Sequence, residues 1–191
     1  NDVDVTLHVQ HAEGPLPVLT LDGVAGGRIR LTVADGEACD VGLHILNSRD
    51  LLVDAPALAG CERGVVIEGS DNIRIRGGQL QHVRRQGVGI TDSRSVVVDG
   101  LEVAGGGAPN PTDPADPTVG VRVDAGSQSV WVRDGVVTGW DLGVLVDGAE
   151  RVVLTGRLGV PDPAALSDAA TPPDPSVSAN GVGVRVDGGS H

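Results

Sequence analysis

Residues 120–135 read GVRVDAGSQSVWVRDG, and much of the chain consists of variations on this phrase. The phrase returns, opening on glycine each time, as GLHILNS, GVVIEGS, GVGITDS, GVLVDGA and GVRVDGG at Gly42, Gly64, Gly87, Gly143 and Gly183. Successive opening glycines are 22, 23, 33, 23 and 40 residues apart. Three intervals therefore have nearly the same length, and the other two contain insertions. A fixed period of this length predicts a repeat architecture.

Each repeat contains short stretches in which apolar and polar residues alternate, as expected for strands with one buried face. In the unit that opens at Gly120, Val121 and Val123 are expected to point inward, and Arg122 and Asp124 outward. Pairs such as DG, GS and GG mark the turns between these stretches. One unit with three strands cannot bury its own apolar face, whereas stacked units can. The pattern therefore predicts a β-solenoid.

The phrases DNIRIRGG at residues 71–78 and SVVVDGLEV at residues 95–103 are similar to those of the pectin-lyase-like superfamily. The resemblance covers nearly the whole chain. It implies an all-β, right-handed parallel β-helix of about seven coils, with three short strands per coil, in one domain over residues 1–191. A β-sandwich is the alternative, but the nearly constant spacing fits it poorly. In this superfamily the substrate groove usually runs along the first strand of each coil.

The two cysteines occupy one column, because Cys39 and Cys61 each lie three residues before an opening glycine. Neighbouring coils are about 4.8 Å apart, which lies within the Cα separation that a disulfide requires. We therefore predict a Cys39–Cys61 disulfide and, from it, an extracellular or cell-surface location. The alternative is a pair of reduced core thiols.

The composition limits the partners. The chain has 29 Gly and 12 Pro but no Phe, Tyr or Met, so Val, Leu, Ile and Ala must form its core. Its net charge of −12 disfavours nucleic acid and anionic membranes as partners. No apolar run is long enough for a membrane span, so membrane insertion is not expected. The sequence begins with Asn1, and we expect a mature or excised form.

The strongest candidate site is a column of carboxylates on the first strands, formed by Asp124, Asp147 and Asp187, with Arg122 and Arg185 two residues before two of them. Stacked carboxylates repel, so we expect some compensation. The alternatives are a bound Ca²⁺, a raised pKa that supplies a general acid or base, ion pairs with the arginines, or hydrogen bonds from turn backbone. Ca²⁺ is the one cofactor that this column suggests.

Other candidates are weaker. His82, Arg84 and Arg85 form a basic cluster in QHVRRQ that could bind a carboxylate of a polysaccharide or be an exposed polar turn. Trp140 and Trp131 could stack on a sugar, although Trp131 is expected to point outward alone. The catalytic motifs of pectate lyases, polygalacturonases and alginate epimerases are not found in the sequence.

Two insertions, at residues 104–118 and 161–180, leave the same corner of the predicted rod. They are interpreted as solvated loops, as sides of a groove, or as docking arms. Neither DVDVTLHVQ at the start nor GVRVDGGSH at the end resembles a capping helix. This indicates either a piece of a longer solenoid or self-association end to end.

These observations lead first to a non-catalytic extracellular β-solenoid, a structural or adhesive module that could stack into fibres. The alternatives use the first-strand face. One is a polysaccharide lyase or epimerase in which Asp124, Asp147 and Asp187 act with Arg122 and Arg185. The other is a Ca²⁺-dependent glycan-binding module.

Overall fold

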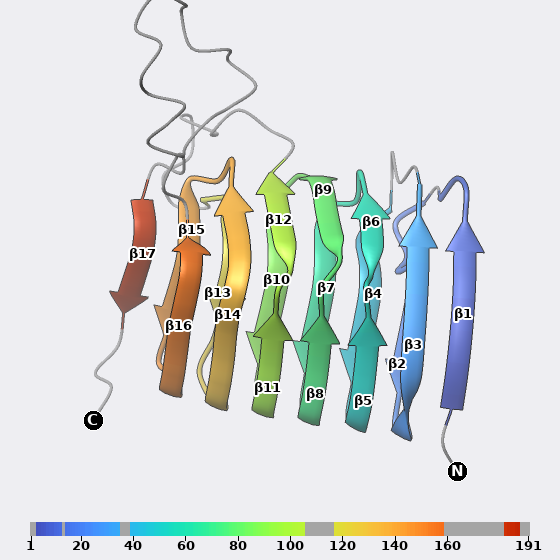
Figure 1. Ribbon diagram of the computed structural model, residues 1–191, viewed down its shortest axis with the longest axis horizontal. Helices are drawn as coiled ribbons and strands as arrows, with labels where there is room; N and C mark the ends of the chain where they lie inside the picture. Colours follow the sequence, from blue (N-terminus) through green and yellow to red (C-terminus); the bar gives the residue numbers. More distant parts are fainter. Residues whose placement is uncertain (1–2, 13, 35–38, 106–116, 159–181, 188–191) are drawn as a thin grey trace, which may run out of the picture.

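The computed structural model describes residues 3–12, 14–34, 39–105, 117–158 and 182–187, and every regular element in these residues is a β-strand (Figure 1). Seven parallel strands form what we call the first-strand sheet: β2 (Leu19–Asp22), β4 (Val41–Leu46), β7 (Arg63–Glu68), β10 (Gln86–Thr91), β13 (Val119–Val123), β15 (Leu142–Asp147) and β17 (Val182–Asp187). No helix in the described ranges is long and apolar enough to cross a membrane.

The remaining strands form the second-strand sheet, which the chain enters after each first strand. Its members are β1 (Val3–Val9), β3 (Ala25–Val33), β5 (Arg49–Asp54), β6 (Ala57–Ala59), β8 (Asp71–Arg76), β9 (Gln79–Val83), β11 (Arg94–Asp99), β12 (Glu102–Gly105), β14 (Gln128–Thr138) and β16 (Glu150–Leu158). The short strands β6, β9 and β12 are the third strands of their coils. In β14 and β16 the second and third strands are continuous.

The register confirms the repeat. Every pairing is parallel, and equivalent residues of successive phrases are partners, as for Leu43 with Val65 and Val65 with Val88. The chain therefore winds into a β-solenoid of about six turns, close to the predicted seven. The predicted insertions fall mainly on residues 106–116 and 159–181, which lie outside the described residues.

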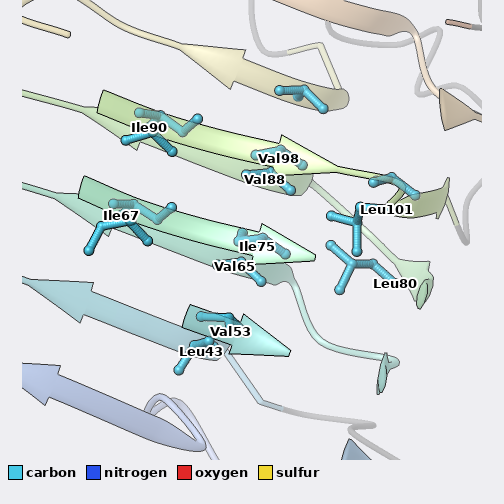
Figure 2. Close-up of a cluster of buried hydrophobic side chains, with 14 of the residues drawn as sticks. Leu43, Val53, Val65, Ile67, Ile75, Leu80, Val88, Ile90, Val98 and Leu101 are labelled. Carbon is cyan, nitrogen blue, oxygen red and sulfur yellow. The ribbon is translucent and has the colours of Figure 1, made fainter. Parts of the chain in front are cut away.

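Aliphatic side chains fill most of the space between the two sheets, as the composition predicts, and Trp140 is the aromatic residue among them. Inward residues of both sheets meet in layers, one layer for each coil (Figure 2). Ile67 and Ile75, for example, are fully buried in the same coil. Each coil buries its apolar residues against the next coil rather than within itself, which explains why the units require stacking.

The opening glycines have a steric role that the sequence did not reveal. A Cβ atom at Gly64 would lie 2.9 Å from Leu80 Cδ1 and 2.5 Å from the carbonyl oxygen of Gly87. Gly87 is similarly enclosed by Val103 and by the backbone of Gly120. The first strand thus approaches the third strand so closely that only glycine fits, and this explains why the phrase opens on glycine.

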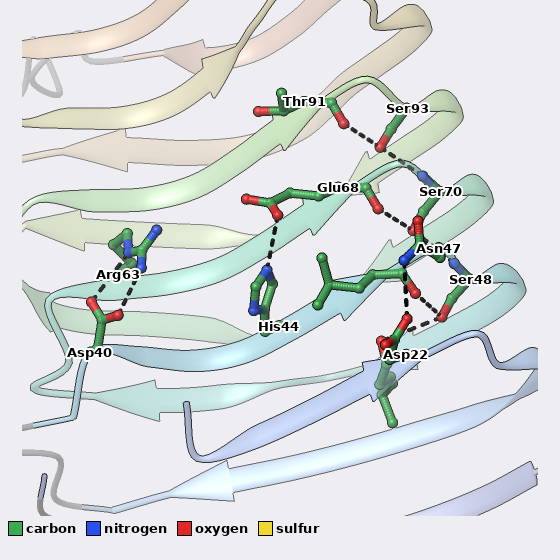
Figure 3. A network of polar contacts seen from close by, with 12 residues as sticks. Asp22, Asp40, His44, Asn47, Ser48, Arg63, Glu68, Ser70, Thr91 and Ser93 are labelled. Carbon is green, nitrogen blue, oxygen red and sulfur yellow. Dashed lines mark hydrogen bonds and ion pairs between the residues drawn. The ribbon is translucent and has the colours of Figure 1, made fainter. Parts of the chain in front are cut away.

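A column of buried serines closes the corner between the first and second strands (Figure 3). The Oγ atom of Ser70 accepts a hydrogen bond from the Ser48 N–H at 3.1 Å and donates one to the Glu68 carbonyl at 2.9 Å. Ser93 repeats both contacts one coil further on. We call this column, which consists of Ser48, Ser70, Ser93 and Ser127, the serine ladder.

The serine ladder satisfies backbone groups that the corner would otherwise leave buried and unpaired. It ends at Ala149, which takes the serine position of the next coil and is also buried. There the N–H of Ser127 bonds to the carbonyl of Asp124 at 3.3 Å instead. A hydroxyl is therefore needed where the neighbouring N–H has no other acceptor.

On its outer face the second-strand sheet carries a column of alternating charge, formed by Arg30, Asp54, Arg76, Asp99 and Arg133. Asp54 accepts bonds from Arg76 Nη2 at 2.7 Å and Arg30 Nη2 at 2.9 Å. Hydrogen bonds from Arg76 and then Arg30 lower the pKa of Asp54, while burial of the carboxylate acts in the opposite direction. Asp99 also has a lowered pKa, with Arg133 as the largest cause.

The predicted disulfide is confirmed. Cys39 and Cys61 are bonded, with their Cα atoms 4.8 Å apart and both residues buried. The bond joins neighbouring coils just before β4 and β7, as the alignment of the phrases requires. It is consistent with an oxidising environment.

Candidate binding face

The outer surface of the first-strand sheet carries two columns of side chains, and they contain the predicted aspartates and arginines. Pairing between neighbouring strands gives the first column, which consists of Thr20, His44, Val66, Gly89, Arg122, Leu145 and Arg185. Two residues further along the strands lies the second, which consists of Asp22, Leu46, Glu68, Thr91, Asp124, Asp147 and Asp187. The face therefore carries isolated carboxylates at Asp22 and Glu68, and its charged groups are densest towards the end that contains β17.

The three stacked aspartates lie where the sequence places them, and arginines pair with two of them. Arg122 Nε donates to both carboxylate oxygens of Asp124, at 2.7 and 3.0 Å. Arg185 Nε lies 2.7 Å from Asp187 Oδ2. Ion pairing with an arginine, one of the four alternatives for reducing the repulsion between the stacked carboxylates, is thus present at Asp124 and at Asp187. No three His, Cys, Asp or Glu side chains in the described part of the chain are grouped so that they could hold a metal ion.

His44 and Glu68 form a further pair on this face. His44 Nε2 lies 3.3 Å from Glu68 Oε2, but without the angles of a hydrogen bond (Figure 3). The Nε2 atom itself is buried. The contact is therefore an ion pair when the imidazole is protonated and otherwise a weak polar contact.

A pocket of about 420 Å³ opens at the corner where the first strands of the middle coils begin. Four successive coils supply its lining, which consists of Asp40, Glu62, Arg63, Arg85, Gln86, Pro117, Val119 and Arg122. The described part of the 104–118 insertion contributes Pro117. The pocket thus lies beside the face described above and shares Arg122 with it.

Ion pairs hold the charged groups of the pocket in place. Arg63 binds Asp40 with two hydrogen bonds, from Nε to Oδ1 at 3.3 Å and from Nη2 to Oδ2 at 2.8 Å (Figure 3). Glu62 lies 3.3 Å from Arg84 Nη1. Since Asp40 and Glu62 directly follow the two bonded cysteines, the disulfide fixes the backbone from which both carboxylates project.

The side-chain amide of Gln86 occupies the space beside Gly89, which has no side chain of its own. A Cβ atom at Gly89 would lie 2.5 Å from Gln86 Nε2. The amide of Gln86 therefore lies across the first column of the face, at the row next to Arg122. Carboxylate, amide and guanidinium groups together give this region both donors and acceptors of hydrogen bonds.

The structure separates the predicted basic cluster. Arg85 lines the pocket. Arg84 contacts the pocket residue Glu62 and donates a 2.7 Å hydrogen bond to the carbonyl of Gly60, but it is not part of the lining. His82 is exposed on β9 with a left-handed backbone (φ 53°) and does not line the pocket. The three residues therefore do not form one binding group.

The prediction that Trp140 stacks on a sugar is wrong. Trp140 is 1% exposed, packs in the core beside Gly87 and Gly120, and donates from Nε1 to the carbonyl of Val103 at 3.2 Å. It fills the space that the opening glycines leave at the third strand. Trp131 does point outward, as predicted, and is 37% exposed on β14.

Four polar residues of the pocket were not recognised in the sequence: Asp40, Glu62, Arg63 and Gln86. A signal for two of them was present, because Asp40 and Glu62 share a column directly after the cysteine column. The predicted disulfide indicated that the backbone at these two positions would be held at a fixed separation. The position of Gln86 over Gly89 had no comparable signal, because it depends on a side-chain conformation.

The comparisons with known proteins support the fold. A similar structure is that of a "putative glycosyl hydrolase" from Parabacteroides merdae, with a TM-score of 0.57 and 12% sequence identity. The similarity covers 81% of this chain and 79% of that chain. No protein-family model and no curated protein matches the sequence. At this identity the similarity bears on the fold alone, and it agrees with the parallel β-helix that the resemblance implied.

Proposed function

We propose that this protein is an extracellular β-solenoid that binds a glycan in the pocket beside the first-strand face and acts as an adhesive module. The observation that carries the proposal is the composition of the pocket, where side chains of four coils converge in a concave site. The buried disulfide supports an extracellular location. The similar structure carries a name that refers to glycans, which supports the ligand class.

The charges of the pocket favour a ligand rich in hydroxyl groups. Three guanidinium groups and the Gln86 amide donate hydrogen bonds, while Asp40 and Glu62 accept them. A hydroxyl group both donates and accepts, so it can use this mixture better than a purely anionic group can. The net charge of −12 also opposes approach of a polyanion.

Catalysis is the second candidate, because Asp40 and Glu62 project from neighbouring coils of a fold shared with a protein named as a glycosyl hydrolase. Glycosidases generally use two carboxyl groups, one of which must donate a proton. Here Arg63 holds Asp40 through two hydrogen bonds, and Arg84 lies 3.3 Å from Glu62. A substrate would have to displace both ion pairs before either carboxyl group could act on it, so we rank the adhesive role first.

The predicted use of Asp124, Asp147 and Asp187 by a lyase, an epimerase or a Ca²⁺-dependent module remains a proposal of lower rank. Arg122 and Arg185 already neutralise two of the three aspartates. A ligand or an ion at this column would have to displace those pairs.

A glycan array followed by titration calorimetry tests the proposal. We expect binding to at least one class of neutral or mixed-charge oligosaccharide, without Ca²⁺. Replacement Gln86→Ala removes one amide and should weaken that binding about three- to tenfold, the range expected for a lost hydrogen bond. Gln128→Ala, on β14 outside the pocket lining, is the matched control and should bind as the wild type does.

The same oligosaccharides should be incubated with the protein and analysed for new reducing ends and for unsaturated products. Neither should form if the protein is an adhesive module. If a product forms and Asp40→Asn abolishes it, the protein is an enzyme and the adhesive proposal fails. Absence of binding to every glycan of the array would also overturn the proposal.

A further inference from the structure

The two ends of the described solenoid are stepped in opposite directions. At one end the second-strand sheet extends one strand further, because β1 lies beyond the coil that contains β2 and β3. At the other end the first-strand sheet extends further, because β17 lies beyond the coil that contains β15 and β16 (Figure 1). Within the described residues, each end therefore presents half of a coil.

We propose that these half coils are complementary and join two copies of this chain end to end. In the joint, β17 of one copy and β1 of the next copy occupy the same level and together make one coil. The edge of β17 that no described strand occupies then pairs with β2 of the next copy, and the corresponding edge of β16 pairs with β1 of the next copy. Both sheets continue through the joint with parallel pairing, and the exposed strand edges become satisfied.

The register of the solenoid specifies which side chains meet. Continuing the inward columns across the joint places Val186 next to Leu21 of the next copy, and Leu154 next to Val5 of the next copy. In the single chain Val186 is 58% exposed, although its partner on β15, Val146, is buried in the core. Val184 is also exposed, at 43%. The joint would thus cover apolar side chains that already belong to the core columns.

Charge opposes the joint and makes it dependent on salt. The column that contains Asp147 and Asp187 would continue into Asp22 of the next copy, so a third carboxylate is added. Each copy also has a net charge of −12. The repulsion extends over about 30 Å at an ionic strength of about 10 mM and over about 8 Å at about 150 mM. Assembly should therefore increase with salt concentration.

End-to-end assembly does not depend on the proposed glycan binding. The pocket is lined from the coils of β4, β7, β10 and β13, which lie between the two ends. A chain that binds no glycan could still assemble, and an adhesive module could remain a monomer. The two proposals therefore fail separately.

Analytical ultracentrifugation of the 191-residue chain, over a range of protein and NaCl concentrations, tests the joint. We expect linear oligomers that grow with salt, and electron microscopy should show rods as wide as one molecule. Val186→Arg places a charge inside the joint and should raise the concentration needed for assembly about tenfold or more. The fold should tolerate it, because this side chain is largely exposed in the single chain.

Val136→Arg is the matched control, since Val136 is also exposed, at 37%, but lies on β14, which is separated from the joint by β16. It should assemble as the wild type does. Asp22→Lys should act in the opposite direction and allow assembly at lower salt, because it places a cation beside Asp187 of the neighbouring copy. A single monomeric species under all conditions would overturn the proposal. Equal assembly by the Val186→Arg and Val136→Arg variants would do so as well.

Discussion

The serine ladder gives the sharpest stability prediction. Ser70→Ala removes the acceptor of the Ser48 N–H and the donor to the Glu68 carbonyl. Ser48 is 2% exposed and Ser70 3%, so water cannot readily replace the lost hydroxyl. A buried N–H group left without a partner costs about 1–3 kcal/mol. We therefore expect a loss of about 2 kcal/mol in the free energy of unfolding.

The ladder contains its own control. Ser127 has longer contacts, since its Oγ lies 3.5 Å from the Ser93 nitrogen and 3.3 Å from the Ile90 carbonyl oxygen. Its replacement by alanine should cost clearly less than Ser70→Ala, because weaker bonds are lost. The natural alanine at residue 149 shows that this column accepts alanine sterically. A difference between the two variants would thus report hydrogen bonding and not packing.

Urea denaturation followed by circular dichroism measures both losses, and thermal unfolding provides a second measure. For a chain of this size, 2 kcal/mol corresponds to a fall of about 4–8 °C in Tm. A loss of less than about 0.5 kcal/mol for Ser70→Ala, the range of ordinary surface substitutions, would refute this role of the serine ladder. Equal losses for Ser70→Ala and Ser127→Ala would refute it too.

Two further predictions concern packing and charge. Gly64→Ala should destabilise the protein by about 1–3 kcal/mol, because the new methyl group meets the rigid carbonyl of Gly87, whereas Gly77→Asn, at an open left-handed position, should change it by less than about 0.5 kcal/mol. Similar urea midpoints for these two variants would contradict the steric role of the opening glycines. Because the folded state lowers the pKa of Asp54, its stabilisation is present above the ordinary pKa of aspartate and is lost as the pH falls through the lowered value. Asp54→Asn should therefore be less stable than the wild type at pH 7, and the difference should shrink towards pH 2, as urea midpoints across this range would show; a constant difference would count against the assignment.

The fold was predictable from the sequence because each repeat contacts only the repeats before and after it. Each strand pairs with the same strand of the next repeat, so a constant spacing in the sequence becomes a column in space. Cys39 and Cys61 show this, since an alignment of letters was enough to place two sulfur atoms within bonding distance. The outward columns of the first-strand sheet followed from the same alignment.

The contents of the interior were less predictable, because they depend on contacts between different strands of a coil. Trp140 was expected at the surface, yet it fills the space beside the opening glycines. Those glycines were recognised only as markers of the repeat, although they allow close approach of the third strand. The serines of the GS pairs were interpreted as turn residues, and their bonds between coils became clear only in three dimensions. The pocket likewise requires a corner that period-two alternation does not describe.

The alternating column that contains Arg30, Asp54, Arg76 and Asp99 constrains how such a chain can change length during evolution. Charge in this column has a period of two coils, whereas the backbone has a period of one. Loss of the single coil that contains β8 would bring Asp54 beside Asp99, and neighbouring strands are only about 4.8 Å apart. Gain or loss of coils in pairs would keep opposite charges adjacent. The column thus favours growth of this solenoid by even numbers of coils.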